Sequence, residues 1–290
     1  MNEFRWLGVF GEVLFDCFPS GEEVLGGAPF NVAWHLQALG DNPLFISRVG
    51  ADAPGQRIRA AMTEWEMACD TLQVDAVHPT GRVEVTLEDG QPQYRIMAPA
   101  AYDFIRDDEL AVPPGDFILY HGTLALRHGT SRAALDALAG RPGAAIFIDV
   151  NLRSPWWNRQ ETLLWLARAR WAKMNEEELR ALGFDAGAVE TAMTALQEEY
   201  AVAQLIVTRG ADGALVRSRD GTFHRVVPPP QGQLVDTIGA GDAFSAVYLH
   251  GLLAGWPIER ILAMAQQLAG VIVAQRGAIP ADRALYRDFH

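Results

Sequence analysis

The sequence has few cysteines, no excess of positive charge and no long uninterrupted apolar run. Its two cysteines, Cys17 and Cys69, are too few for a disulfide framework, and no CxxC pair suggests a zinc site. Acidic residues number 36 against 24 lysines and arginines, so the formal net charge is -12. Nucleic acids and anionic membranes bind clustered cations, which makes both poor partners for this chain. An anionic substrate stays open where a local pocket or a metal supplies positive charge.

No segment offers the roughly 18 consecutive apolar residues that a membrane helix requires. The opening residues, Met1 to Trp6, carry two charges and lack the apolar run of a signal peptide. With 49% hydrophobic and 21% charged residues, the composition is that of a globular protein with a large core. We therefore expect a cytoplasmic protein with one domain over residues 1–290.

Two common nucleotide-binding loops are also missing. The glycines at 239–241 are not followed by the Gly-Lys-Ser/Thr of a Walker loop. They do not form the dinucleotide motif GxGxxG either, because Phe244 stands where its third glycine should fall. After the first predicted strand, Gly11 is followed by Glu12 and Val13, which also breaks that motif. A nicotinamide-dependent oxidoreductase is thereby disfavoured, although nicotinamide reduction without ATP consumption would revive it.

Short apolar runs alternate with helical patterns along most of the chain. The run at 6–10 predicts a buried first strand, and Val32, Leu36 and Leu39 recur at helical spacing up to Gly40. Further strands are predicted at 44–49, 117–121, 144–150, 171–174, 205–208 and 214–216, and further helices at 132–139, 242–255 and 258–275. Strands that alternate with helices predict an α/β fold with a doubly wound, mainly parallel sheet flanked by helices.

Apolar and polar side chains alternate from Arg82 to Glu88, a period of two that indicates a strand with one solvated face. Asp89-Gly90 is a hairpin turn signal, and the alternation resumes in a return strand that reaches Ile96. We expect this hairpin to project from the main body. Small insertions that build a second sheet are expected at about 12–24 and 81–98.

The segment Gly239-Ala240-Gly241-Asp242 opens a predicted helix. Backbone N–H groups of small residues at a helix N-terminus can approach an anion closely, and the helix dipole favours negative charge there. Such a site can hold a phosphoryl group during transfer, and Asp242 beside it can accept a proton from an attacking hydroxyl. An acidic residue is also common in any first helical turn, so an ordinary helix start is an equally simple interpretation of this segment alone.

The longer string Asp236-Thr237-Ile238-Gly239-Ala240-Gly241-Asp242 resembles the D-T-x-G-A-G-D signature of the ribokinase-like (PfkB) carbohydrate kinases, with every fixed position present. The segment Gly26–Ala33 resembles the N-terminal motif of the same family. The two motifs stand near opposite ends of the chain, and the strands and helices between them match as well. The resemblance therefore covers essentially the whole chain, and the opening Gly11–Asp16 is most similar to bacterial fructokinases.

The resemblance implies an ATP-dependent kinase that transfers the γ-phosphate to a sugar hydroxyl. It assigns Asp242 as the catalytic base and the backbone at Gly239, Ala240 and Gly241 as the anion hole. Asp149–Arg153 is similar to the D-x-N-x-R strings of sugar kinases, although a hydrogen-bond network at a strand end would also explain it. The substrate-binding residues that the resemblance implies are Asp16, Gly27, Asn31, Asn151 and Arg153.

The resemblance also implies nucleotide and metal sites. Asn175-Glu176-Glu177-Glu178 is similar to the family's N-x-x-E element, in which Glu178 supports Mg²⁺ indirectly, with a solvated helix start as the alternative. A monovalent-cation site for K⁺ is implied around Asp236 and Ile238, with the segment 276–278 nearby. The nucleotide-binding residues that the resemblance implies are Asn175, Thr208, Arg209, Gly210 and Gly213.

In this family a β-sheet lid covers the sugar and excludes water, which would otherwise compete for the γ-phosphate. The predicted hairpin is similar to such a lid, and its exposed edge could pair across a homodimer. We expect a free sugar, D-fructose first, because no cationic cluster for a second phosphate stands out. Ribose, 2-keto-3-deoxygluconate and nucleosides remain open as acceptors, and so does a non-catalytic sugar sensor on the same fold.

Overall fold

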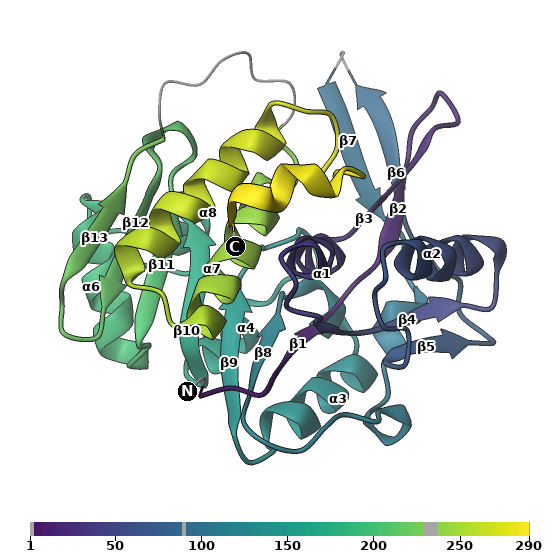
Figure 1. Cartoon of the computed structure of the whole chain (residues 1–290), viewed down its shortest axis with the longest axis horizontal. Coiled ribbons are helices and arrows are strands. Elements are labelled where there is room, and N and C mark those ends of the chain that lie inside the picture. Colours follow the sequence, from purple (N-terminus) through teal and green to yellow (C-terminus); the bar gives the residue numbers. More distant parts are fainter. Residues whose placement is uncertain (1–2, 89–90, 229–236, 290) are drawn as a thin grey trace.

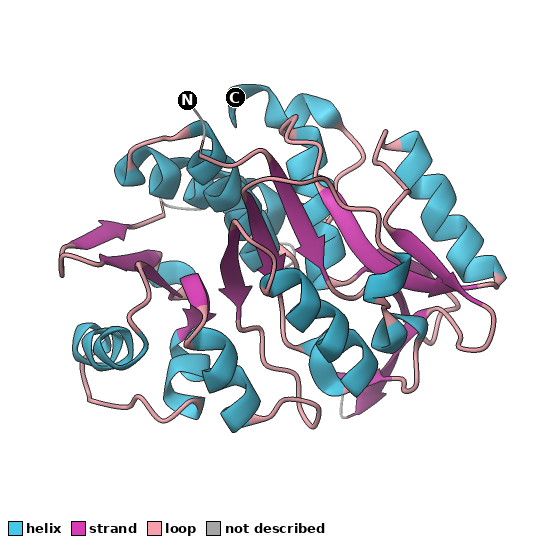
Figure 2. Cartoon of the chain, turned by 90° about the horizontal axis from the view of Figure 1, so that it is seen from below, coloured by secondary structure: helices cyan, strands magenta, loops and turns pink. Residues whose placement is uncertain are grey.

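The computed structural model describes residues 3–88, 91–228 and 237–289. The main body is a nine-stranded sheet with helices on both faces (Figures 1 and 2). Its strand order is β13 (Phe223–Val226), β12 (Ala214–Ser218), β11 (Gln204–Thr208), β10 (Ala169–Asn175), β9 (Ala144–Asp149), β8 (Phe117–His121), β1 (Trp6–Phe10), β4 (Leu44–Gly50), β5 (Leu72–Asp75). From β11 to β5 all neighbours are parallel, and β12 and β13 are antiparallel. The predicted mainly parallel sheet is confirmed.

Alternate residues of the parallel strands face two hydrophobic cores. In β8, Ile118 and Tyr120 belong to one core while Phe117 and Leu119 belong to the other, as the two-residue period of a strand requires. Strands that are apolar on both faces explain the continuous apolar runs of the sequence. The first core is covered by α1 (Ala28–Ala38), α2 (Ala53–Glu64), α7 (Ala240–Ala254) and α8 (Ile258–Val273), and the second by α3 (Gly129–Ala139), α4 (Arg159–Leu166), α5 (Glu176–Ala181) and α6 (Val189–Tyr200).

A small second sheet projects from the main one (Figure 1). Its strand order is β3 (Glu23–Gly26), β2 (Leu14–Cys17), β6 (Gly81–Glu88), β7 (Gln91–Ile96). In β6, Val83 and Val85 are buried whereas Arg82 and Thr86 are exposed, so the expected alternation is confirmed. The turn predicted at Asp89-Gly90 lies outside the described residues.

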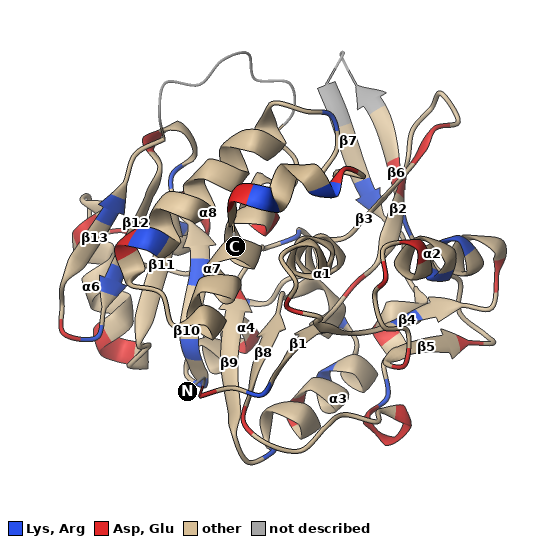
Figure 3. Ribbon diagram, in the orientation of Figure 1, with Lys and Arg blue, Asp and Glu red and all other residues tan. Residues whose placement is uncertain are grey.

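Charged residues of both signs are distributed over many elements of the fold (Figure 3). Cys17 and Cys69 are both free thiols. In the described part of the chain, every helix is too short or too polar to cross a bilayer.

Candidate active site

The two sequence motifs from opposite ends of the chain meet in the fold. Asn31 lies in the first turn of α1, and Asp242 lies in the first turn of α7. The side-chain amide of Asn31 donates a hydrogen bond of 2.8 Å from Nδ2 to Oδ2 of Asp242, across a separation of 211 residues in the sequence. Both helices start beside the carboxyl ends of parallel strands, where α/β folds bind their ligands.

Gly239 shapes the start of α7. It is the N-cap residue and has a left-handed backbone with φ of 81°. A Cβ atom at this position would lie 2.3 Å from Cβ of Ala278, so a larger residue would displace one of the two segments. The N–H of Ala240 donates to the backbone oxygen of Thr237 at 3.5 Å, and the N–H of Ala243 donates to that of Gly239 at 2.9 Å. The N–H groups of Gly241 and Asp242 lie between them and have no acceptor within the helix, which is the arrangement that binds anions at helix N-termini. The anion hole at this helix start stays a prediction.

Several groups set the pKa of the Asp242 carboxyl, which is raised to about 6. Burial is the main cause and raises it, whereas the hydrogen bond from Asn31 lowers it. The negative charge of Asp149 raises it further, and the positive charges of Lys173 and Arg153 lower it. A carboxylate with this pKa is ionised at neutral pH and is a stronger base than an exposed aspartate.

A buried polar network supports the start of α7 from below. Oδ2 of Asp149, at the end of β9, accepts hydrogen bonds from Nζ of Lys173 at 2.8 Å, from Oγ of Ser245 at 2.7 Å and from the hydroxyl of Tyr120 at 3.2 Å. The exposed fractions of the Lys173 and Asp149 side chains are only 7% and 5%. A Cβ atom at Gly241 would lie 3.5 Å from Nζ of Lys173, so the ammonium group lies directly under the anion hole.

Lys173 was not predicted as a site residue, although the sequence holds a signal for it. Lys173 is the only lysine of the chain, and every other residue of its Lys and Arg total is an arginine. An ammonium group is a compact charge with three donors, whereas a guanidinium is a broad planar fork. A single lysine in a chain otherwise rich in arginine therefore indicates a site that requires a small buried cation.

The predicted sugar-contacting residues lie together around the start of α1. Gly27 caps α1 with φ of 110°, and a Cβ atom there would lie 2.7 Å from the backbone oxygen of Glu12. A Cβ atom at the neighbouring Gly26 would lie 3.5 Å from Oδ2 of Asp16 and 4.0 Å from Oδ1 of Asn31. Oδ1 of Asn31 is buried and has no hydrogen-bond partner in the described part of the chain. It is therefore a free acceptor at the predicted sugar site.

Arg153 follows β9 and acts on this site electrostatically. Its side chain is exposed, and its positive charge lowers the pKa values of Asp16, Glu12 and Asp242. Burial outweighs this effect at Asp16, whose pKa is raised to about 6. Asn151, two residues earlier, has a left-handed backbone with φ of 39°, a conformation that few residues other than glycine adopt. The strand-end loop thus turns sharply and brings a cation toward three carboxyl groups.

Asn175 and Glu178 form a capping box at the start of α5. Oδ1 of Asn175 accepts from the N–H of Glu178, and Oε2 of Glu178 accepts from the N–H of Asn175, both at 2.8 Å. Oε1 of Glu178 also accepts from the N–H of Leu152 at 2.8 Å, which joins α5 to the loop after β9. Burial raises the pKa of Glu178. The motif is therefore a helix start that its own side chains cap, with Glu178 partly buried rather than solvated, and its role at Mg²⁺ stays a prediction.

The donor set suits a magnesium ion that is held mainly by phosphate and water. The described residues contain no cluster of three or more His, Cys, Asp or Glu side chains that could hold a metal by themselves. Both oxygens of Glu178 are already occupied by N–H donors, which favours contact through water. Mg²⁺ commonly keeps several waters and takes few protein carboxylates when it accompanies a nucleotide. Glu178 fits that pattern.

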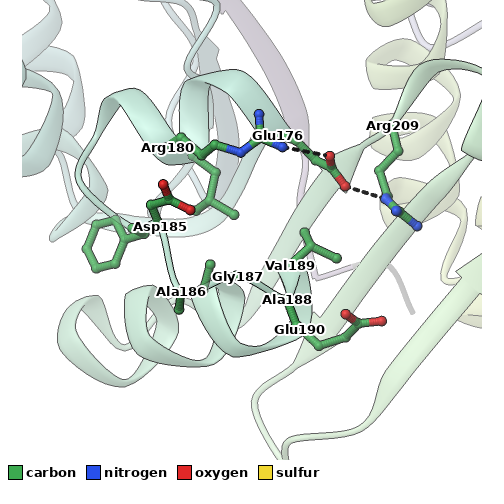
Figure 4. A pocket seen from close by; sticks show the side chains of 12 residues that line it. Glu176, Arg180, Asp185, Ala186, Gly187, Ala188, Val189, Glu190 and Arg209 are labelled. Atoms are coloured by element: carbon green, nitrogen blue, oxygen red, sulfur yellow. Dashed lines mark hydrogen bonds and ion pairs between the residues drawn. The ribbon is translucent and has the colours of Figure 1, made fainter.

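The predicted nucleotide loop follows β11. Gly210 and Gly213 have left-handed φ values of 55° and 83°, and a Cβ atom at Gly213 would lie 2.0 Å from a backbone oxygen of β13. Nε of Arg209 donates to Glu176, which also accepts from Arg180 (Figure 4). These side chains line a pocket of about 270 Å³ between α5, α6 and the loop. The guanidinium of Arg209 is thus held at α5, while its backbone N–H donates to Gly213 at 2.7 Å.

The predicted residues of the monovalent-cation site are only partly described. Asp236 lies outside the described residues. Ile238 is 44% exposed, and Ala278 lies against Gly239. The segment 276–278 therefore does reach the loop that precedes α7.

Comparisons with known proteins find relatives over the whole chain. The chain is 32% identical to a fructokinase of Salmonella typhimurium, with all of both chains covered, and 32% identical to a fructokinase of Klebsiella pneumoniae, with 93% of this chain and 91% of the relative covered. Among solved structures, a Vibrio cholerae fructokinase double mutant bound to fructose, ADP and potassium matches with a TM-score of 0.85 at 26% identity over the full length of both chains. An aminoimidazole riboside kinase from Salmonella enterica, complexed with aminoimidazole riboside and an ATP analogue, matches with a TM-score of 0.83 at 27% identity, covering 99% of this chain and 100% of that one.

The family model of the pfkB carbohydrate kinases matches residues 17–284. That range contains Asn31 and Asp242, the two residues that join the motifs. This chain belongs to the pfkB family of carbohydrate kinases.

Proposed function

We propose that this protein is a fructokinase that transfers the γ-phosphate of ATP to a hydroxyl group of D-fructose. The hydrogen bond between Asn31 and Asp242 carries the proposal, because it joins the predicted sugar side to the predicted phosphate side at one carboxylate. Two relatives that are 32% identical are fructokinases, and a structural neighbour was solved with fructose and ADP bound. The inferred free-sugar acceptor agrees with these relatives.

In the proposed reaction, a fructose hydroxyl attacks the γ-phosphorus of ATP in line with the leaving oxygen of ADP. The O–H bond breaks and Asp242 receives the proton, while a new O–P bond forms and the bond to the β-phosphate oxygen breaks. Asn31 fixes the orientation of the carboxylate through its 2.8 Å hydrogen bond. The N-terminal N–H groups of α7 and the ammonium of Lys173 stabilise the charge of the transferring phosphoryl group.

The remaining predicted residues position the two substrates. Asp16, Gly27 and Asn31 bind sugar hydroxyls, and Arg153 neutralises the surrounding carboxylates. Asn175 and Glu178 hold the Mg²⁺ that accompanies ATP through water, and that ion supplies positive charge to the phosphates. The loop Thr208–Gly213 binds the nucleotide. We propose that the small sheet closes over the sugar as a lid and excludes water from the γ-phosphate.

A panel of acceptors tests the proposed substrate. Fructose, ribose, 2-keto-3-deoxygluconate, and nucleosides that include aminoimidazole riboside are each supplied with Mg·ATP, and the release of ADP is measured. We expect fructose to give the highest kcat/KM. A higher kcat/KM with a nucleoside would replace fructose as the acceptor. ADP release that stays at the background rate with every acceptor would contradict the kinase and favour the sugar sensor.

Three finer features belong to the same proposal. We propose a homodimer through β7, which is an edge strand of the small sheet, and a single monomeric species in sedimentation at micromolar concentration would contradict it.

We also propose a K⁺ ion between the loop at Ile238 and the segment 276–278, so that K⁺ stimulates turnover more than Na⁺ does. The need for ATP and the two free thiols favour a cytoplasmic location.

A further inference from the structure

Besides Oδ1 of Asn31, three further buried side-chain atoms close to the proposed sugar site lack hydrogen-bond partners in the described part of the chain. They are Oε2 of Glu12, the hydroxyl of Tyr102 and Nη1 of Arg127, and none has a partner within the described residues. Their side chains are well buried: Glu12 is 3% exposed, Tyr102 is fully buried, and the Arg127 side chain is 4% exposed. Buried polar groups in folded proteins are nearly always hydrogen-bonded, and leaving one unpaired costs stability. Three such atoms on neighbouring residues point to a missing ligand atom.

The backbone brings these three residues together at the root of the small sheet. A Cβ atom at Gly81, where β6 begins, would lie 2.5 Å from the backbone oxygen of Val13 and 2.6 Å from Cε1 of Tyr102. The Tyr102 ring therefore packs beside the residue that follows Glu12. The guanidinium of Arg127 stacks over the same ring, 5.1 Å from its centroid. The charges of Glu12 and Arg127 also act on each other, since Arg127 lowers the pKa of the Glu12 carboxyl.

Arg127 is held so that one nitrogen stays unused. Its Nε and Nη2 atoms donate to the two carboxylate oxygens of Asp103, at 2.7 and 2.9 Å. Nη2 also donates to the backbone oxygen of Met97, just after β7, at 2.9 Å. Cζ of the guanidinium also lies 4.6 Å from the ring centre of Trp156, in the loop that follows Arg153. Because the guanidinium is clamped on these sides, Nη1 is oriented before any ligand arrives.

Glu12 connects this group to the proposed sugar site. Its backbone oxygen is in contact range of Gly27, at the start of α1. Its carboxyl group lies within electrostatic reach of both Arg153 and Asp242. The unpaired acceptor is therefore on the side of the site where the sugar binds, and not under the nucleotide loop.

We propose that Glu12, Tyr102 and Arg127 bind one hydroxyl group of the acceptor sugar. They thereby favour sugars that carry this hydroxyl over sugars that lack it. A hydroxyl group has one proton to donate and two lone pairs that accept. It would donate to Oε2 of Glu12 and accept from the Tyr102 hydroxyl and from Nη1 of Arg127. The one acceptor and two donors left unpaired match this capacity. The inference rests on the proposed function, because it takes the acceptor to be a sugar.

Selection follows from the cost of the unpaired state. A site built around buried polar groups rejects a ligand that lacks the matching hydroxyl, because those groups then stay unpaired in the complex. A water molecule retained under the sugar has the same oxygen chemistry, and it would occupy the site whichever sugar is bound. A sugar hydroxyl and a retained water can be told apart by experiment. If a sugar hydroxyl occupies the site, the effect of substituting these residues on kcat/KM depends on which sugar is bound. If a water occupies it, the effect is the same for every sugar.

Tyr102→Phe is the most direct variant, because it removes a hydroxyl that bonds nothing in the described fold. We expect the melting temperature without sugar to stay the same or to rise, and KM for fructose to rise about tenfold or more, with KM for ATP unchanged. The matched control is Tyr248→Phe, which removes a buried hydroxyl that donates to Gln204 at 2.8 Å. The control should lower the melting temperature and leave KM for fructose unchanged.

A series of singly deoxygenated fructose analogues identifies the ligand atom. One analogue lacks the hydroxyl that Glu12, Tyr102 and Arg127 bind. For that analogue, we expect the variants Tyr102→Phe and Glu12→Gln to have the same kcat/KM as the parent enzyme within about twofold. For fructose, we expect kcat/KM of both variants to fall about tenfold or more below that of the parent. An unchanged KM for fructose in both variants would overturn the proposal. So would an equal loss for fructose and every analogue, since that is the behaviour of a retained water. If fructose is not the acceptor, the parent enzyme shows this in the acceptor panel before any variant is made. The acceptor with the highest kcat/KM then takes the place of fructose, and its deoxygenated analogues are compared in the same way.

Discussion

Lys173 and Asp149 form a buried ion pair directly under the proposed anion hole, and their charges act on the carboxylate of Asp242, the proposed base. Asp149 also accepts from Ser245, which lies one turn along α7 from Gly241. The pair therefore holds the helix start in place and balances two effects on Asp242, because Asp149 raises the pKa of Asp242 and Lys173 lowers it. A buried carboxylate that loses its partner destabilises a fold strongly.

We expect Lys173→Met to lower the free energy of unfolding by about 3–5 kcal/mol, because it leaves Asp149 buried without a cation. It should also move the acid limb of the pH profile of kcat upward, since the pKa of Asp242 loses a group that lowers it. The double variant with Asp149→Asn should recover part of the stability. Urea denaturation measures the first effect, and a Lys173→Met protein as stable as the parent would show that the pair is not buried as described.

Glu12 makes the stability of the fold depend on pH. Burial raises its pKa from 4.5 to about 7, so the folded chain holds this proton more tightly than the unfolded chain does. The stabilisation is complete below pH 4.5 and is lost as the pH rises through about 7. We expect Glu12→Gln to raise the free energy of unfolding relative to the parent by up to about 3 kcal/mol at pH 8 and by much less at pH 5. Thermal melts at the two values test this, and a gain that is larger at pH 5 would contradict it.

At the scale of elements, the function depends on how α7 begins. Gly239 adopts a left-handed φ of 81° with Ala278 packed against its Cα, so the helix start and the segment 276–278 share one narrow contact. Gly255 ends the same helix with φ of 67°, and nothing lies within 4 Å of a Cβ atom there. A substitution at Gly239 would cause both backbone strain and a clash with Ala278, whereas a substitution at Gly255 would cause backbone strain alone.

We expect Gly239→Ala to lower kcat at least about tenfold, because displacing the N-terminus of α7 moves the anion-hole N–H groups away from the phosphate. Gly255→Ala bears the same kind of left-handed strain, about 1–2 kcal/mol, without the clash and should leave kcat unchanged. Steady-state kinetics of the two variants, with melting temperatures, distinguish the cases. Equal kcat values would mean that the start of α7 does not set the rate.

Over the whole molecule, the elements with strong patterns were predictable from the sequence. The apolar runs at β1, β8 and β9 are buried on both faces, and the alternation in β6 follows from one exposed face. α2, α4, α6, β5 and β13 were not predicted. The side chains of α2 are mostly exposed, so its apolar positions are few and leave a weak periodic signal.

The site was predictable where a short motif carries the chemistry, as with Asn31 and Asp242. It was not predictable where the residues come from separate strands and loops. Glu12, Tyr102 and Arg127 converge through tertiary packing, and no spacing in the sequence relates them. Arg209 shows a further limit, because its guanidinium pairs with Glu176 of α5. Only the fold decides which polar group a long side chain meets.

We propose Asp242 as the base between a sugar that is bound from the start of α1 and a phosphate that is bound at the start of α7. The most direct test is kcat of Asp242→Asn with fructose and Mg·ATP, measured by ADP release. We expect a loss of at least about a hundredfold with a smaller change in KM for fructose, and no loss in the surface control Asp220→Asn. A kcat for Asp242→Asn equal to that of the parent would contradict the account.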